Sequence, residues 1–117
     1  MKALALGLLL ASAALVRAHA FLDHADPRVG STVDAAPPAL RLFFTEGIEP
    51  AFSRIEVDDA KGQKLATGPP EHPAPATLQV PLPALPAGEY TVRWSVVSVD
   101  THPTEGKFTF SVKGARQ

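Results

Sequence analysis

Apolar and polar residues alternate with a period of two over several short stretches of this chain. The clearest stretches are residues 52–57, 77–82, 90–96 and 107–112, and residues 40–45 add a run rich in β-forming side chains. This period is typical of strands that bury one face, and turn-forming residues separate the stretches. No segment after residue 18 shows a sustained helical period. The pattern predicts an all-β domain, either a sandwich or a barrel.

Three local features refine this prediction. Pro81 removes a backbone donor from the stretch 77–82, so we expect an edge strand there. Gly62 marks a hairpin turn within residues 60–64, and the proline-rich segment 69–76 reads as an extended loop.

Tyr90 enters a strand two residues after Gly88. This placement resembles the tyrosine corner of Greek-key, immunoglobulin-like sandwiches, although an ordinary strand tyrosine fits the same pattern. Trp94 shares a face with Tyr90, so we expect it in the core.

The first 18 residues have the features of a secretory signal peptide. Lys2 supplies a positive charge, and the uncharged apolar run 3–16 is shorter than the about 20 residues of a membrane span. Small residues allow cleavage after Ala14, Ala18 or Ala20. We favour the cut after Ala18, which leaves residues 19–117 as the mature domain.

Composition narrows the function classes. A chain of 117 residues has room for one domain, and its net charge of −1 gives no basic footprint for nucleic acid. The sequence contains no cysteine, so it has neither disulfides nor a thiolate metal site.

Metal chemistry is the strongest functional hypothesis that the residues suggest. Asp100 and His102 are separated by one residue, so an extended backbone points both side chains to the same side. Such a pair alone is weak evidence for a metal site, because an Asp–His pair is more often structural. If cleavage exposes His19, its α-amine and imidazole can chelate a metal, and the His102 imidazole adds a third nitrogen. A tetragonal set of nitrogen and oxygen ligands suits Cu(II), whereas zinc prefers a tetrahedron.

The two remaining histidines carry weaker signals. His72 lies between prolines, and we interpret it as a solvated side chain. His24 lies five residues after His19, so strand alternation points it to the opposite face, with a surface role and at most a secondary ligand role.

Several motifs together resemble the CopC family of periplasmic copper-binding proteins. The similarity runs through "HAFLDHADPRVGSTV", "PPALRLFFTEGIEP" and "LPAGEYTVRWSVVSVDTHPTEGKFTFSV", which cover essentially the whole mature chain. These segments match the family's N-terminal histidine, its L-x-F-[ST]-E strand, its G-x-Y-x-V-x-W strand and its S-x-D-x-H turn. The resemblance implies a Greek-key sandwich or barrel of about seven strands.

The resemblance also implies a Cu(II) site formed by His19, Asp100 and His102. Glu46, in the "FTE" segment, is then expected near the copper as a weak ligand or as a residue that orients an imidazole. Some members carry a second, methionine-rich Cu(I) site, but the only methionine here is Met1. We therefore expect a Cu(II)-only, monomeric periplasmic protein that sequesters copper or delivers it to a CopD-type inner-membrane protein, rather than an enzyme.

Two alternatives remain open at this stage. A similar amine and imidazole arrangement occurs in copper-dependent oxidative enzymes that act on polysaccharides, but this chain lacks an obvious aromatic platform for such a substrate. The other alternative is a metal-free, immunoglobulin-like structural domain. It explains the strands but treats His19, Asp100 and His102 as coincidental.

Overall fold

A computed structural model describes residues 19–114 of the chain, so the predicted signal peptide, residues 1–18, lies outside the described residues. Within the described range the chain forms eight strands and one short 3₁₀ helix, and no helix there is long and apolar enough to cross a membrane. The elements are β1 (Leu22–Asp26), β2 (Thr32–Val33), β3 (Ala39–Phe44), η2 (Pro50–Phe52), β4 (Arg54–Asp58), β5 (Glu71–Ala74), β6 (Thr77–Pro81), β7 (Gly88–Val97) and β8 (Pro103–Val112).

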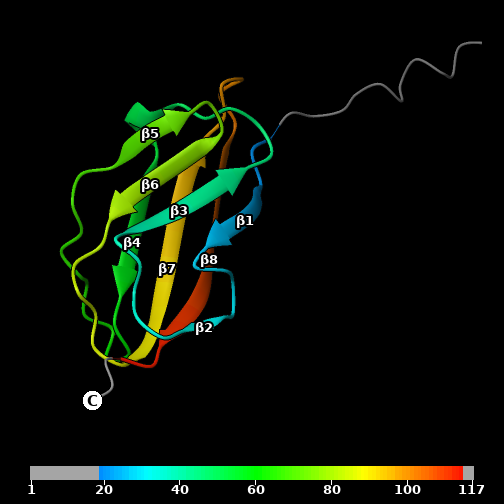
Figure 1. Cartoon of the computed structure of the whole chain (residues 1–117). Helices are drawn as coiled ribbons and strands as arrows, with labels where there is room; N and C mark the ends of the chain where they lie inside the picture. The colour runs from blue at the N-terminus through cyan, green and yellow to red at the C-terminus, as the bar shows by residue number, and fades with distance from the viewer. Residues whose placement is uncertain (1–18, 115–117) are drawn as a thin grey trace, which may run out of the picture.

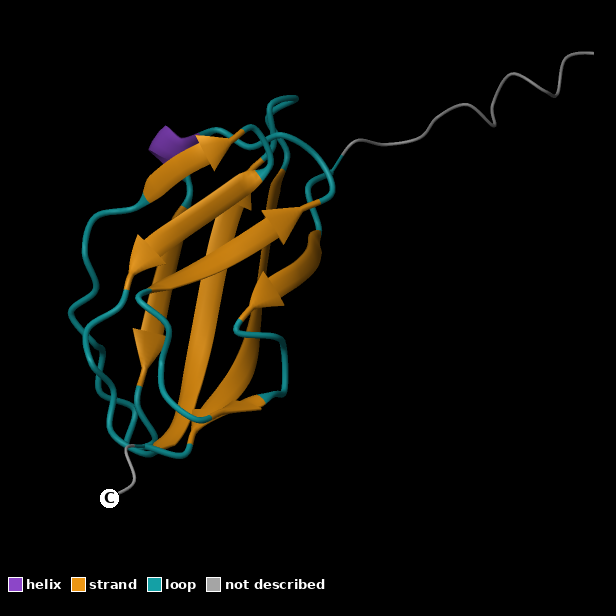
Figure 2. Cartoon of the chain, viewed as in Figure 1, coloured by secondary structure: helices purple, strands orange, loops and turns teal. Residues whose placement is uncertain are grey.

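The strands form two sheets that pack face to face. One sheet has the order β1-β3-β6-β5 and the other has the order β2-β8-β7-β4, as Figure 1 shows. All pairs are antiparallel except β2 with β8, which is parallel. The predicted all-β sandwich is confirmed, and the sheets do not close into a barrel (Figure 2). The described residues form eight strands, close to the about seven that the resemblance implies, and the short strands β2 and β5 had no clear strand pattern in the sequence.

The core lies between the sheets and follows from the alternation in the sequence. Along β3, inward positions are buried and outward positions are half-buried; β7 and the second half of β8 alternate in the same way, with some outward positions of β7 fully exposed. Each buried aliphatic or aromatic side chain contributes about 1.5–3 kcal/mol. With no disulfides, this packing is the main source of stability. The largest side chains that are almost fully buried are Phe110, Leu40, Leu42, Leu78, Val57, Val80, Val92 and Val96.

Two predictions about the first sheet were wrong. Strand β6 lies between β3 and β5 rather than at an edge, and Pro81 is tolerated because it occupies the last position of the strand. The segment 69–76 contains β5, which is the edge strand and is exposed at all four positions. Prolines beside and within β5 are typical of an edge that must not pair with another chain.

Tyr90 forms the tyrosine corner that its position suggested. Its hydroxyl donates to the carbonyl oxygen of Pro86 at 2.6 Å, while its ring is buried and stacks on Phe110 with centroids 5.7 Å apart. Trp94 is also buried, as predicted, and meets Phe44 of the other sheet edge-on. These contacts join the strand β7 both to its preceding loop and to the core.

The change Tyr90→Phe tests the contribution of this corner. We expect it to lower the free energy of unfolding at neutral pH by about 0.5–1.5 kcal/mol, because the part-buried hydrogen bond from the Tyr90 hydroxyl to the Pro86 carbonyl is lost. Burial also raises the pKa of Tyr90, with a smaller contribution from Asp59. The stabilisation linked to this pKa shift should therefore be fully present below the unfolded-state pKa of about 10 and be lost as the pH rises above it. The Tyr90→Phe variant should show no such loss.

Urea unfolding at neutral and alkaline pH measures both effects. Because Tyr90 is the only tyrosine, the absorbance of tyrosinate reports its titration directly. An unchanged unfolding midpoint at neutral pH would show that the corner contributes nothing to stability.

One end of the sandwich gathers segments that are distant in sequence. The N-terminal residues 19–21, the β3–β4 connection 45–53, the β5–β6 turn 75–76 and the β7–β8 loop 98–102 meet at the upper end in Figure 1. Backbone hydrogen bonds join them: Ile48 donates to Pro75 at 3.0 Å, and Val99 donates to Gly47 at 3.0 Å. We call these four segments the histidine end.

Candidate metal centre

His19 and His102 contact each other at the histidine end, although they come from opposite ends of the described chain. Their ring centroids are 4.5 Å apart, and the ring planes are tilted by 43°. His19 is half-buried, and the side chain of His102 is 53% exposed. Two imidazoles therefore meet at a position that solvent and a small solute can reach.

Threonine hydroxyls hold the segment that carries His19. Thr45 donates from Oγ1 to the carbonyl oxygen of His19 at 3.3 Å and accepts the backbone N–H of Phe21 at 3.0 Å. Thr104 donates from its hydroxyl to the carbonyl oxygen of Ala20 at 2.7 Å, and Ala20 itself is fully buried. The residue that follows β3 and a residue of β8 thus fix His19 through its own backbone and that of its neighbours, and its nitrogen atoms take no part in these bonds.

His102 is positioned by the tight loop between β7 and β8. Ser98 is fully buried and its backbone N–H donates to the carbonyl oxygen of His102 at 3.0 Å. The Ser98 hydroxyl accepts the backbone N–H of His102 at 3.2 Å and also contacts the carboxylate of Asp100. Thr101 has a φ of 71°, a left-handed conformation that is rare for a residue with a β-carbon. Several interactions therefore fix a short and strained loop.

Asp100 orients the imidazole of His102. Its Oδ2 lies 3.2 Å from Nδ1 of His102, and its Oδ1 accepts the Ser98 hydroxyl. The Ser98 hydrogen bond, and then the nearby His102, lower the pKa of Asp100. The carboxylate therefore stays ionised at neutral pH. Because Asp100 faces Nδ1, the Nε2 atom of His102 is left as the atom that can bind a metal.

The predicted ligand residues thus lie together, but their side chains alone do not form a complete metal site. Among residues 19–114 no group of three or more His, Cys, Asp or Glu side chains has an arrangement that could hold a metal ion. The His19 and His102 imidazoles meet, whereas Asp100 faces the ring of His102. A metal ion bound by the two imidazoles would need a further donor, and the backbone nitrogen of His19 could be one only as a free amine.

The other candidate residues have simpler surroundings. Glu46 is exposed, and within residues 19–114 its carboxylate makes no hydrogen bond or ion pair. His24 is exposed, pairs with Asp23 at 2.8 Å and stacks on Phe43 with centroids 4.2 Å apart. His72 is exposed and its Nε2 lies 3.1 Å from the carbonyl oxygen of Pro75. The structure brings neither His24 nor His72 into contact with the His19–His102 pair.

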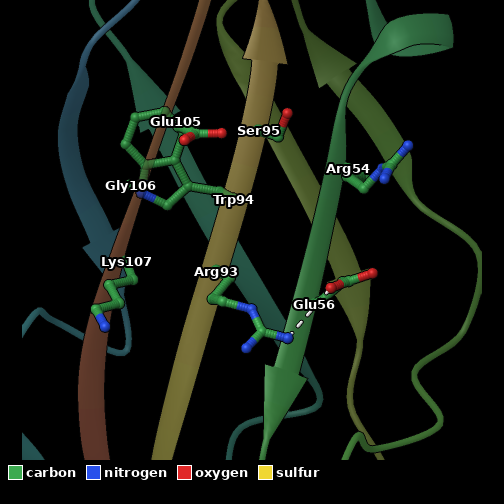
Figure 3. Close-up of a pocket in the computed structure, with 8 residues that line it drawn as sticks. All are labelled: Arg54, Glu56, Arg93, Trp94, Ser95, Glu105, Gly106 and Lys107. Atoms are coloured by element: carbon green, nitrogen blue, oxygen red, sulfur yellow. Dashed lines mark hydrogen bonds and ion pairs between the residues drawn. The ribbon is translucent and has the colours of Figure 1, made fainter.

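A separate hollow of about 450 Å³ lies on the outer face of the second sheet (Figure 3). Charged side chains of both signs line it, and Glu56 pairs there with Arg93 at 3.4 Å. The indole of Trp94 lies against Gly106, where a β-carbon would come within 2.6 Å of it. The hollow contains none of the predicted metal ligands.

Sequence reasoning missed the residues that position the histidines. Thr45 directly precedes the predicted Glu46, and it is Thr45 whose hydroxyl holds the His19 segment. Ser98 belongs to the S-x-D-x-H motif but was given no role. Its small hydroxyl next to an acidic residue and a histidine is the signal that could have indicated a loop-fixing serine.

Ser98→Ala tests this positioning role. We expect a loss of about 1–2 kcal/mol in the free energy of unfolding, because the buried hydroxyl bonds to both His102 and Asp100. The pKa of Asp100 should rise towards its ordinary value, which carboxylate NMR can follow. Ser95→Ala, a half-buried serine of β7, is the matched control and should change stability by less than about 0.5 kcal/mol. Equal effects of the two changes would contradict the role of Ser98.

The comparison with known domains decides the family. The CopC domain matches residues 22–113, which are nearly all of the described sandwich. The chain belongs to the CopC family. This result agrees with the all-β architecture and with the motifs that carried the resemblance.

Individual known proteins are similar to the chain over most of their length. Protein YobA of Escherichia coli K12 is 43% identical over 101 residues, which are 84% of this chain and 82% of YobA. The crystal structure of CopC from Methylosinus trichosporium OB3b matches with a TM-score of 0.79 and 36% identity, over 85% of this chain and 98% of that protein. PcoC, a methionine-rich copper resistance protein from Escherichia coli, matches with a TM-score of 0.74 and 34% identity, over 82% and 100%.

Proposed function

We propose that the mature protein begins at His19 and binds one Cu(II) ion at the histidine end. The α-amine and imidazole of His19 and the imidazole of His102 supply three nitrogen ligands. Asp100 either supplies an oxygen ligand or holds the His102 imidazole in position. The contact between the His19 and His102 rings, with centroids 4.5 Å apart, is the observation that carries the proposal.

The chemistry of the donors favours Cu(II). Nitrogen and oxygen ligands in a tetragonal arrangement suit this ion, and copper has the highest affinity among the first-row divalent metals. The sequence has no cysteine, and its only methionine is Met1, which the proposed cleavage removes. The mature chain therefore offers no soft sulfur ligands for Cu(I). In this respect it differs from PcoC, which is methionine-rich.

The proposed roles of the two carboxylates differ. Asp100 is fixed beside His102 at 3.2 Å and stays ionised, so it can bind copper through one oxygen or hold the imidazole for binding. Glu46 lies one residue from Thr45, which holds the His19 segment, and we assign it a weak or orienting role. Both carboxylates compensate part of the positive charge of the ion.

The biological role that fits this site is copper binding without a catalytic step. We propose that the protein is exported to the periplasm through residues 1–18 and acts there as a monomer. It would sequester Cu(II) or deliver it to a CopD-type inner-membrane protein. The family membership and the copper-resistance names of its relatives support this assignment.

The pH dependence of Cu(II) affinity tests the proposed amine ligand. An α-amine has an ordinary pKa of roughly 7.7–8.0 and must lose its proton to bind metal. We expect affinity to fall about tenfold for each pH unit below that range, because one proton is released per copper bound. Competition titrations against a chelator of known affinity, at several pH values between 8 and 6, measure the slope. A flat profile would contradict amine ligation.

A further inference from the structure

The histidine end carries most of the large apolar side chains that the described residues expose. Phe21 is 55% exposed, Val99 is 58% exposed and Phe52 is 71% exposed, whereas Val29, with 54% exposed, lies outside these segments. Phe21 directly neighbours the site, with its ring centroid 5.9 Å from that of His19. Solvent-facing phenylalanines around a functional site are a common feature of protein interfaces.

The charge of the same end is uniformly acidic. Its four segments contain Glu46, Glu49 and Asp100 but no lysine or arginine. The nearest basic residue in sequence, Arg54, begins β4 and lies on the outer face of the second sheet beside the hollow in Figure 3. Strands β4 and β8 end at the lower end of the molecule in Figure 1, away from the histidine end, and Lys61, Lys64 and Lys113 follow these strand ends in the sequence.

These two properties indicate the kind of surface that fits the histidine end. We propose that the histidine end is a docking face for a protein partner whose contact surface is apolar and bordered by lysine or arginine. Phe52 and Phe21 are the aromatic anchors, Val99 adds further exposed apolar surface, and the acidic residues steer and orient the basic border of the partner. An anionic membrane surface is the less suitable occupant, because it repels acidic side chains.

The inference rests on the proposed function in one respect: a partner that docks here covers His19 and His102 and can exchange copper with them directly. The docking itself does not require the metal. The anchors are therefore separable from the ligands, and Phe52 in particular belongs to η2 rather than to a segment that carries a histidine.

Site-specific photocrosslinking in the native host tests the proposal. A benzophenone amino acid replaces Phe21, Phe52 or Val99 in turn, and the same probe at Val29 is the matched control of equal exposure. We expect the first three positions to capture one and the same protein, through a segment that sequencing of the crosslinked peptides shows to be apolar with flanking lysine or arginine. Glu49→Lys should lower the crosslinking yield at position 52 by roughly tenfold. Thermal unfolding of this variant confirms that it folds.

Other outcomes would overturn the proposal. These are crosslinks to lipid, crosslinks to segments without basic residues, equal capture from position 29, or no capture above the unirradiated control. The same experiment with His102→Ala separates the two hypotheses. If crosslinks persist while Cu(II) binding is lost, docking is independent of the metal. If the wild-type protein binds Cu(II) but gives no crosslinks, only the docking inference fails.

Discussion

Replacing His102 by alanine is expected to lower the Cu(II) affinity of the mature protein by more than roughly 100-fold. Residues that merely orient a metal ligand typically cost 10–100-fold when they are changed, so loss of a ligand itself should exceed that range. His102 supplies one of only two imidazoles that meet at the histidine end. Its side chain is about half exposed, so its removal should leave the fold intact.

His72→Ala is the matched control for this experiment. His72 is also an exposed histidine, in the edge strand β5, but it contacts Pro75 rather than His19. Its replacement should leave Cu(II) affinity unchanged, and both variants should unfold at temperatures close to that of the wild type. Unchanged Cu(II) affinity in His102→Ala would contradict the proposed site and favour the alternative of a metal-free structural domain.

Acetylation of the His19 α-amine is expected to have an effect of similar size. It converts the amine into an amide and so removes one nitrogen and the chelate ring that this nitrogen closes with the imidazole. We expect Cu(II) affinity to fall by roughly 100-fold or more, since a direct ligand is again lost. The fold should be unaffected, because the segment is held through the carbonyl oxygens of His19 and Ala20 and the backbone N–H of Phe21.

A chain that starts at His19 without acetylation is the reference for this measurement, and competition with a chelator gives both affinities. The pH dependence provides a second readout, because the acetylated protein should lose the proton release that the amine contributes. Equal affinities with and without the acetyl group would mean that the amine is not a ligand, even if His102 is.

Much of the fold follows from the local sequence pattern. The alternation along β3, β7 and β8 predicts their inward faces, because a strand that packs on a second sheet must bury every other residue. Strand order is a property of the tertiary structure and does not follow from this pattern. Pro81 indicated an edge, but β5 pairs beyond β6, and β5 itself has a proline-rich sequence without a strand pattern.

The site was only partly predictable. Asp100 and His102 are close in sequence, so a local rule places them side by side, and the contact between them is present. The approach of His19 depends on bonds from Thr45, which directly follows β3, and from Thr104, which lies in β8 of the other sheet. No local rule reveals such long-range bonds. The family resemblance identified His19 instead, and it also directed attention to Glu46, whose carboxylate the described residues leave without a partner.

A native mass spectrum of the exported protein in a slight excess of Cu(II) tests the central claim most directly, because it reports the N-terminus and the metal count of the same molecules. We predict a chain that begins at His19 and carries one copper ion. A chain that begins at Leu15 or Phe21, or a chain that begins at His19 and holds no copper, would contradict the proposed site.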